Sequence, residues 1–301
     1  MAFNQTAGID LHIHSTASDG SLSPVQILQK AERLGLKAIG ITDHDSLEGS
    51  RAALLIGSSS SMGFLTGVEI SASPPPGFRV SGSFHILGYA IRLDHPGLNT
   101  ALETQRQARK ARNPQIIKRL NDLGMTISDE QLQAEFPHAQ IGRPHIAQLM
   151  LRKGYARSID DAFDRFIGKG RPAYVEKYRM SCSSTIETIR QAGGFAVLAH
   201  PSLLKVDGWD TFQALVSSMK DLGLAGLEAY YPEHSPEQTK ALIDMAERHD
   251  LLVTGGTDFH GAINPEIEMG SGKGSFRVPY QVYEAIMNRF QHSVRAAALT
   301  G

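Results

Sequence analysis

Two hydrophobic patterns alternate along the chain. Short continuous runs of hydrophobic residues predict buried strands, and segments with hydrophobic residues three or four positions apart predict helices. The strands are expected in two groups, at residues 9–13, 37–42, 64–70 and 84–91 and then at 195–199, 226–230 and 251–255. Helices are expected after most of them, at residues 24–34, 46–56, 209–222, 236–249 and 279–292. This alternation predicts an α/β fold with a parallel sheet, either closed as a barrel or doubly wound.

The stretch between the two groups has a different pattern. Residues 99–178 are charged and poor in strand signals, and helical spacing recurs at 102–123, 128–136, 144–153 and 158–167. We interpret residues 99–178 as a helical insert that caps the mouth of a discontinuous barrel formed by residues 1–98 and 179–301. The alternative is that these segments are extra crossover helices that only stiffen the fold.

Three shorter features are assigned structural roles. The serine run at residues 58–61 is expected to be a solvated connection, and His138 a structural or solvated residue. The Ser-Pro-Pro-Pro-Gly segment at residues 73–77 predicts a stiff turn between strands.

Composition excludes several functional classes. Lys plus Arg number 30 and Asp plus Glu number 31, a formal net charge of −1, which argues against a broad basic surface for duplex DNA. The single cysteine, Cys182, excludes an internal disulfide and a multi-cysteine zinc site. The chain has no signal-peptide pattern and no apolar run near the roughly 18 residues that span a membrane. We therefore expect a cytoplasmic protein without a membrane partner. Because a capped barrel needs no second chain, we also expect a monomer.

Histidines and carboxylates gather where the predicted strands end, which is where parallel α/β folds place their chemistry. Six of the 12 histidines lie at such carboxyl ends: His12, His14, His44, His85, His200 and His260. Three acidic residues accompany them, namely Asp19, Glu69 and Asp258. His12 and His14 are two residues apart on a strand, so their imidazoles project from one face and can chelate a divalent ion.

A metal centre explains this pattern better than core packing does. A single buried histidine is more often a hydrogen-bonded core residue, but ionisable groups at five strand ends are costly to bury unless they are paired or metal-bound. Imidazole and carboxylate ligands without thiolate suit manganese, iron or zinc. The number of ligands indicates two or three divalent ions.

The chain resembles the PHP (polymerase and histidinol phosphatase) family in a series of ordered motifs: His12-x-His14, Asp19, Thr42-Asp43-His44-Asp45, Glu69, His85, His200-Pro201 and Asp258-x-His260. Gly142-Arg143-Pro144-His145 and Gly170-Arg171-Pro172-Ala173-Tyr174 are similar to the branch of 3′,5′-nucleoside bisphosphate phosphatases and short-RNA 5′ exonucleases. The resemblance implies a distorted (β/α)7 barrel with a trinuclear centre. The segment between Glu69 and His85 is longer than this branch leads us to expect, so the rim of the pocket is expected to differ.

The resemblance also implies a role for each residue. It assigns three ligand sets: His12, His14, Glu69 and Asp258; then Glu69, His85 and His200, with Glu69 bridging; and Asp19, His44 and His260. It places His200, His145 and Asp19 at the catalytic centre, with His145 donating a hydrogen bond or protonating the leaving oxygen. Arg143 and Arg171, together with His145, are the expected phosphate ligands, because arginine grips phosphate in a bidentate way. The alternative is that each Arg-Pro pair opens a helix and its guanidinium faces solvent.

The implied activity is that of a metal-dependent phosphoesterase. Its substrate would be a small AMP-like nucleotide or a short oligonucleotide, hydrolysed by a metal-bridging hydroxide. The alternatives are histidinol phosphate or another small phosphomonoester or diester, an amidohydrolase-type C–N hydrolase, and a non-catalytic nucleotide or metal sensor. The amidohydrolase alternative is disfavoured because Glu69 occupies the place where that class commonly has a modified lysine. The sensor alternative is disfavoured because such modules can lose metal ligands, and no expected ligand is missing here.

Overall fold

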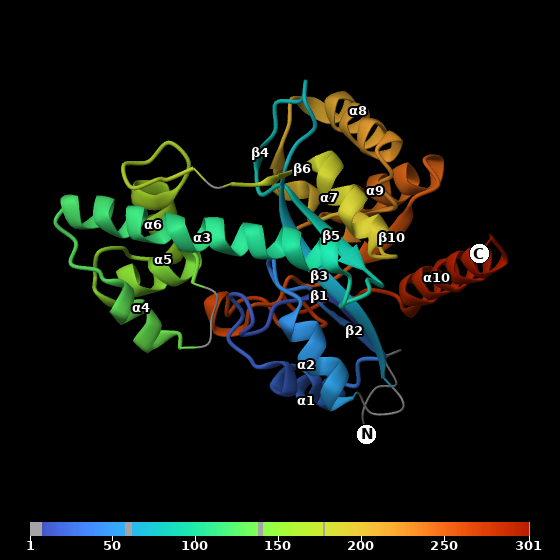
Figure 1. The fold of residues 1–301 in the computed structure, drawn as a ribbon, viewed down its shortest axis with the longest axis horizontal. Helices are drawn as coiled ribbons and strands as arrows, with labels where there is room; N and C mark the ends of the chain where they lie inside the picture. Colours follow the sequence, from blue (N-terminus) through green and yellow to red (C-terminus); the bar gives the residue numbers. More distant parts are fainter. Residues whose placement is uncertain (1–7, 58–61, 138–140, 177, 301) are drawn as a thin grey trace.

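A curled sheet of seven strands forms the frame of the protein (Figure 1). The computed structural model describes residues 8–57, 62–137, 141–176 and 178–300, so the expectations for residues 58–61 and His138 lie outside the described residues. The strands follow the order β1 (Ile9–Ile13), β2 (Ala38–Ile41), β3 (Gly63–Ser73), β5 (His85–Tyr89), β7 (Phe195–Leu198), β9 (Gly226–Tyr230) and β10 (Leu252–Gly255). A short strand, β6 (Met180–Ser181), pairs with β3.

The expectation of a parallel sheet is wrong for one strand. β5 runs antiparallel to both β3 and β7, whereas the other neighbours on this path are parallel. No helix joins β3 to β5, and a parallel neighbour would need such a crossover. The chain instead turns at residues 73–77 and forms β4 (Ser81–Gly82), which pairs with β8 (Leu204–Lys205). As a result, His85 lies at the start of its strand but at the same sheet edge as the carboxyl ends of the parallel strands.

The segment after β10 closes the curl against β1. The amide of His14 donates to the carbonyl of Phe259 over 2.9 Å, and the amide of Phe259 donates to the carbonyl of His12 over 3.3 Å. A Cβ at Gly256 would lie 2.3 Å from the backbone nitrogen of His12, so only glycine lets these two backbone segments lie this close together. The closure brings the loop that carries Asp258 beside the two histidines of β1.

Helices flank the sheet: α1 (Pro24–Leu34), α2 (Glu48–Ile56), α7 (Cys182–Gln191), α8 (Gly208–Asp221), α9 (Pro236–Arg248) and α10 (Tyr280–Thr300). The sequence did not predict α7, because polar residues fill most of its positions and only two isoleucines and a cysteine mark its apolar side. Its buried Ile186 and Ile189 nevertheless pack into the largest apolar core. Within the described part of the chain, no helix has the length and apolarity needed to cross a membrane.

The insert contains α3 (Pro96–Asp122), α4 (Asp129–Glu135), α5 (Arg143–Arg152), α6 (Ile159–Ala162) and a π turn at Phe163–Ile167. Figure 1 shows α3 running from the sheet into the insert. Leu98 and Leu102 belong to the barrel core, whereas Ile116 and Leu120 belong to a separate core inside the insert. The boundary predicted at residue 99 thus falls inside α3.

Buried polar contacts attach α3 to the barrel. Arg109 pairs with Asp45, which follows His44 in the loop after β2, and neither side chain is more than 7% exposed. One turn earlier, Gln105 Nε2 donates to the carbonyl oxygen of Ser71 over 2.8 Å. The insert is therefore fixed to a loop that also carries a predicted metal ligand.

Replacing Arg109 by Met should lower the free energy of unfolding by about 3–5 kcal/mol, because Asp45 would remain buried without its cationic partner. Urea denaturation measures the change. The control is Arg106→Met on the same helix, whose partner Glu103 is exposed, and which should change stability by at most about 1 kcal/mol. Equal effects of the two substitutions would contradict the anchoring role of Arg109.

Candidate metal centre

The structure brings all nine predicted metal ligands to one edge of the sheet. His12 and His14 lie on β1, Glu69 on β3 and His85 at the start of β5. The others lie in loops that follow strands: Asp19 after β1, His44 after β2, His200 after β7, and Asp258 and His260 after β10. Each strand contributes only one or two ligands, so the cluster exists only when the sheet is assembled.

The ligand atoms form three overlapping sets. Within each set, one atom from every residue lies within 4.8 Å of the others: His12, His14, Glu69 and Asp258; His14, Asp19, His44 and His260; and His44, Glu69 and His85. His200 lies next to the third set, with its Nε2 2.8 Å from Glu69 Oε1 and 3.3 Å from His85 Nδ1. His14 and His44 each belong to two sets, which the sequence did not indicate.

Glu69 occupies the centre of the cluster and is 1% exposed. Its two carboxylate oxygens lie 2.7–3.5 Å from five imidazoles, those of His12, His14, His44, His85 and His200. Oε1 faces His85 and His200 and Oε2 faces the other three imidazoles, so a carboxylate at this position could be shared between two ions.

Several buried electron-pair donors in this cluster face one another without hydrogen-bond partners. They are His12 Nε2, His14 Nε2, Asp19 Oδ1, Glu69 Oε2 and Asp258 Oδ1. Buried polar atoms without partners are costly, and lone pairs pointing toward a common centre are satisfied by cations. The residues present therefore fit divalent metal ions.

The pKa values show how strongly these groups are coupled. Burial lowers the pKa of His14, but the carboxylates of Asp258 and Glu69, 3.0 and 3.2 Å from its Nε2, outweigh burial and raise this pKa to about 10. Burial raises the pKa of Glu69, but the charges of nearby imidazoles, His44 first, bring it well below its usual value. Burial lowers the pKa of His85 to about 4. The carboxylates are thus ionised, and a divalent ion would displace the proton of His14 as it binds.

Glu228 positions two ligands and was missed by the sequence analysis. This fully buried residue of β9 accepts a hydrogen bond from His12 Nδ1 over 2.9 Å and from the amide of His200 over 2.6 Å. The first contact keeps the His12 proton on Nδ1 and leaves Nε2 free to bind a metal. A carboxylate inside the apolar strand 226–230 is the signal that could have revealed it.

Asp10 and Asp43 brace the loops around the cluster. Asp10 accepts hydrogen bonds from the amides of Thr257 and Gly270 over 2.9 and 2.8 Å, and burial raises its pKa to about 6. Asp43 accepts from the hydroxyls of Ser15 and Ser18 over 2.7 and 2.6 Å. These contacts fix the loops from which Asp258 and Asp19 project.

The insert places His145 near the cluster. His145 is 1% exposed, and its Nδ1 accepts a hydrogen bond from the amide of Gly142 over 3.0 Å, so the proton of the neutral ring is on Nε2. Burial lowers the pKa of His145, and the charges of Asp19 and His260 also act on it. A neutral imidazole that can donate from Nε2 therefore lies on the metal side of the insert.

The two predicted phosphate-binding arginines differ in environment. The Arg143 guanidinium is half-buried, lies 5.3 and 5.6 Å from the ring centres of Phe163 and Tyr174, and donates to the carbonyl of Ile167 over 3.1 Å. Arg171 is exposed in the turn that follows the π turn. The structure thus holds Arg143 in one position and leaves Arg171 at the surface.

A cleft of about 590 Å³ separates the insert from the barrel. Pro144 and residues 158–160 line it from the insert, whereas Tyr231, Asp258 and His260 line it from the barrel. The cleft gives a small molecule access to two of the predicted ligands.

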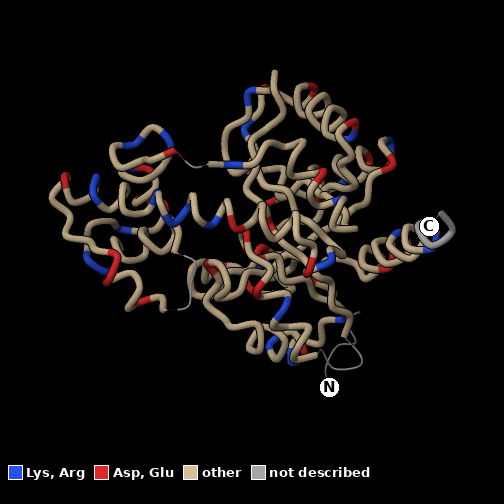
Figure 2. Tube along the Cα trace, in the orientation of Figure 1, with Lys and Arg blue, Asp and Glu red and all other residues tan. Residues whose placement is uncertain are grey.

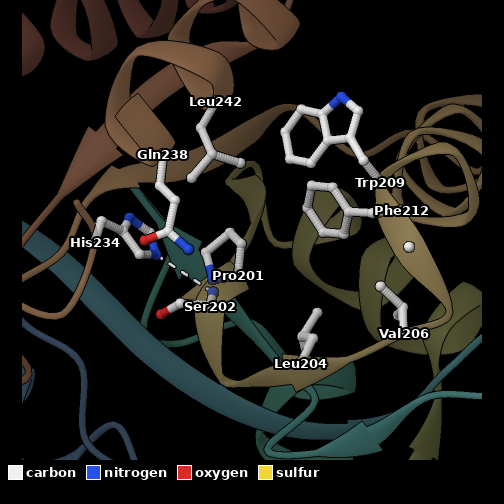
Figure 3. A pocket seen from close by; sticks show the side chains of 10 residues that line it. Pro201, Ser202, Leu204, Val206, Trp209, Phe212, His234, Gln238 and Leu242 are labelled. Atoms are coloured by element: carbon white, nitrogen blue, oxygen red, sulfur yellow. Dashed lines mark hydrogen bonds between the residues drawn. The ribbon is translucent and has the colours of Figure 1, made fainter. Parts of the chain in front are cut away.

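A second pocket, shown in Figure 3, lies behind the turn that carries His200 and is mostly apolar. Trp209, Phe212 and Leu242 line it, and His234 Nε2 accepts a hydrogen bond from the amide of Ser202 over 3.3 Å. This contact supports the turn after His200, and the pocket adds no carboxylate to the metal cluster.

Comparisons with known proteins place this site in context. The model of the family described as PHP domain matches residues 10–223. A Haemophilus influenzae protein named 5′-3′ exoribonuclease is 30% identical over 256 residues, 85% of this chain and 90% of the relative. A Chromobacterium violaceum protein named 3′,5′-nucleoside bisphosphate phosphatase is 29% identical over 255 residues, 84% of this chain and 87% of the relative. A crystal structure from Bifidobacterium adolescentis, provisionally assigned as a metal-dependent phosphoesterase, has a TM-score of 0.79 at 27% identity and covers 95% of this chain and 97% of that one. The resemblance seen in the motifs is confirmed.

Replacing Glu69 by Gln should reduce the number of Mn ions bound per chain, because one ligand oxygen and the central negative charge are lost. Elemental analysis of protein loaded with Mn measures this. Glu268→Gln, a surface carboxylate paired with Lys30, is the control and should retain the wild-type content. Unchanged Mn content in Glu69→Gln would refute its central position.

Replacing Glu228 by Gln should weaken Mn binding by about 10- to 100-fold without removing a ligand, because His12 and His200 lose their anionic support. Competition with a chelator measures the affinity. Glu233→Gln in the following loop, where the side chain is exposed, should leave it unchanged. Equal affinities for the two variants would contradict the positioning role.

Proposed function

The chain belongs to the PHP domain family and is a metal-dependent hydrolase of phosphate esters, and from this premise we propose that its substrate is a nucleotide or a short oligonucleotide. The observation that carries the proposal is the arrangement of the insert. Arg143 and His145, from the first turn of α5, belong to the insert that faces the metal-binding edge across the cleft. Names of relatives that act on nucleoside bisphosphates and RNA support this substrate class.

We propose that two or three divalent ions, Mn, Fe or Zn, occupy the ligand sets. The sets are those that the resemblance implies: His12, His14, Glu69 and Asp258; Glu69, His85 and His200; and Asp19, His44 and His260. When bound, such ions supply Lewis-acid activation of a water nucleophile and neutralise negative charge on the phosphoryl group.

The protein's own residues then bind and orient the ester. Arg143 binds a phosphoryl group of the substrate, and its stacking between two aromatic rings limits the conformational freedom lost on binding. Arg171, an exposed residue of the insert, is the second phosphate ligand in this proposal. His145 donates its Nε2 proton to the leaving oxygen, a role that needs the tautomer fixed by Gly142. Asp19 and His200 complete the catalytic centre as ligands beside the reacting phosphoryl group.

The alternative activities differ from the proposed one in the substrate that each would bind or hydrolyse. Histidinol phosphate and other small phosphate esters need the same metal chemistry but not a nucleoside. A sensor would bind a nucleotide without turnover, yet every ligand that the resemblance requires is present. The expectations of a monomer, of a cytoplasmic location and of no binding to duplex DNA rest on the sequence and remain predictions.

Mn-loaded protein should release phosphate from 3′,5′-bisphosphoadenosine, with 5′-AMP and a 5′-phosphorylated oligonucleotide tested in parallel. Arg143→Ala should lower kcat/KM by about 10- to 100-fold, because a charge-assisted hydrogen bond to phosphate is lost. Arg152→Ala, at the other end of α5 and with an exposed side chain, is the matched control and should retain activity. No release from any of the three, with bound Mn confirmed, would rule out the nucleotide proposal.

A further inference from the structure

The two carboxylate oxygens of Asp258 have different surroundings. Oδ1 lies 3.4 Å from His12 Nε2 and 3.0 Å from His14 Nε2, and it has no hydrogen-bond partner among the described residues. Oδ2 accepts a hydrogen bond from the hydroxyl of Tyr231 over 3.3 Å. Oδ1 therefore faces the position that an ion in this ligand set would occupy, whereas Oδ2 is engaged by a side chain outside the nine predicted ligands.

An irregularity in the sheet places Tyr231 at the metal-binding edge. β9 and β10 pair in parallel register, with Thr254 opposite Glu228, but the next partners are Gly255 and Tyr230. β9 thus has one extra residue at this point, as in a β-bulge, a feature that often redirects side chains next to a functional site. The end of β9 then supplies two residues to the ligands, Glu228 from within the strand and Tyr231 from its end.

Two histidine rings fix the side chain of Tyr231, which is 7% exposed. The centre of its ring lies 5.8 Å from that of His200 and 5.4 Å from that of His234. His234 Nδ1 donates a hydrogen bond to the carbonyl of Ala229 over 2.8 Å, and its Nε2 accepts one from the amide of Ser202 over 3.3 Å. His234 therefore links the loop after β9 to the turn after His200, and the phenol is held against its acceptor.

The contact between Tyr231 and Asp258 lies at the cleft between the insert and the barrel. Both residues line this cleft, and the Asp258 side chain is 18% exposed, whereas those of His12 and His14 are fully buried. Of these ligands, Asp258 is thus the one that faces an entering molecule. A carboxylate that binds an ion through both oxygens fills two of its coordination positions, and one that binds through a single oxygen fills only one.

The charge of the cleft makes an open position on an ion important. Figure 2 shows acidic residues near the middle of the barrel. Four carboxylates and one lysine line the cleft: Asp160, Glu233, Asp258, Glu266 and Lys273. This lining repels an anionic ester, so the attraction that draws a phosphoryl group to this wall has to come from the ions.

We propose that Tyr231 is a positioning residue that restrains Asp258 to bind a divalent ion through Oδ1 alone, which keeps one coordination position of that ion open toward the cleft. The hydrogen bond does so by engaging Oδ2, and such contacts outside the ligand set commonly orient metal ligands. The inference rests on the proposed function, whose ions and substrate it requires, and it adds a residue that the motifs did not include.

The first test measures the metal and needs no turnover. Tyr231→Phe removes the hydroxyl but keeps the ring that packs on His200 and His234. Asp258 should then bind Mn through both oxygens, so the affinity for Mn, measured by competition with a chelator, should equal that of the wild type or exceed it by up to about 10-fold. The enhancement of water-proton relaxation by bound Mn should fall, because fewer positions on the ions remain open to water. Glu228→Gln, by contrast, should weaken Mn binding.

The second test measures activity on 3′,5′-bisphosphoadenosine. Tyr231→Phe should lower kcat/KM by about 10- to 100-fold, because the substrate loses a position on the metal. The matched control is Tyr230→Phe, which alters the preceding tyrosine, a residue that lines a separate surface groove with Phe276. This control should keep the wild-type Mn affinity, relaxation and activity. Equal Tm values for the two variants show that neither change acts through the fold.

Each other outcome overturns the inference. If Tyr231→Phe binds Mn more weakly with unchanged relaxation per bound ion, Tyr231 only supports the ligand loop. If kcat/KM falls while both Mn readouts stay at the wild-type level, Tyr231 contacts the substrate and does not act through Asp258. If the wild type hydrolyses no nucleotide, the proposed substrate is wrong, and the Mn affinity and relaxation of Tyr231→Phe still decide the role of Tyr231.

Discussion

The burial of Glu69 among five imidazoles is the constraint on which the rest of the structure depends. A carboxylate can be buried only where opposite charge or hydrogen-bond donors surround it. Here the compensating imidazoles come from four different strands or the loops that follow them, so the sheet has to curl until those ends meet. Glu228, Asp10 and Asp43 then fix the ligands and loops from behind with further buried hydrogen bonds. Divalent ions bound by these residues would satisfy the lone pairs that this arrangement leaves pointing inward.

The antiparallel β5 and the closure at Gly256 both serve this convergence. Reversing β5 brings the first residue of a strand, His85, to the edge where the parallel strands end. The glycine lets the loop that carries Asp258 pack directly on the backbone of His12. The direction of β5 and the packing at Gly256 do not change which residues act as ligands, but both bring those residues within a few ångströms of one another.

The insert adds positive charge to a centre whose carboxylates are ionised. Arg109 pairs with the buried Asp45 and so fixes α3, and the same helix continues to Arg112, whose Nε and Nη1 have no hydrogen-bond partner among the described residues. One helix thus attaches the insert to the barrel and contributes to the apolar cores of both.

The sequence alone determined the strand and helix order, the existence of the insert and the residue types of the site, because periodicity and the His-x-His and Asp-x-His motifs are local signals. It did not reveal that β5 is antiparallel or that α7 exists, since strand direction follows from the connection made and α7 lacks a clear apolar stripe. Only the tertiary structure decided which ligands share a set, that Glu228 orients two of them, and that Arg109 pairs with Asp45. These are contacts between residues that are far apart in the sequence, and they form only when the strands, loops and helices pack together.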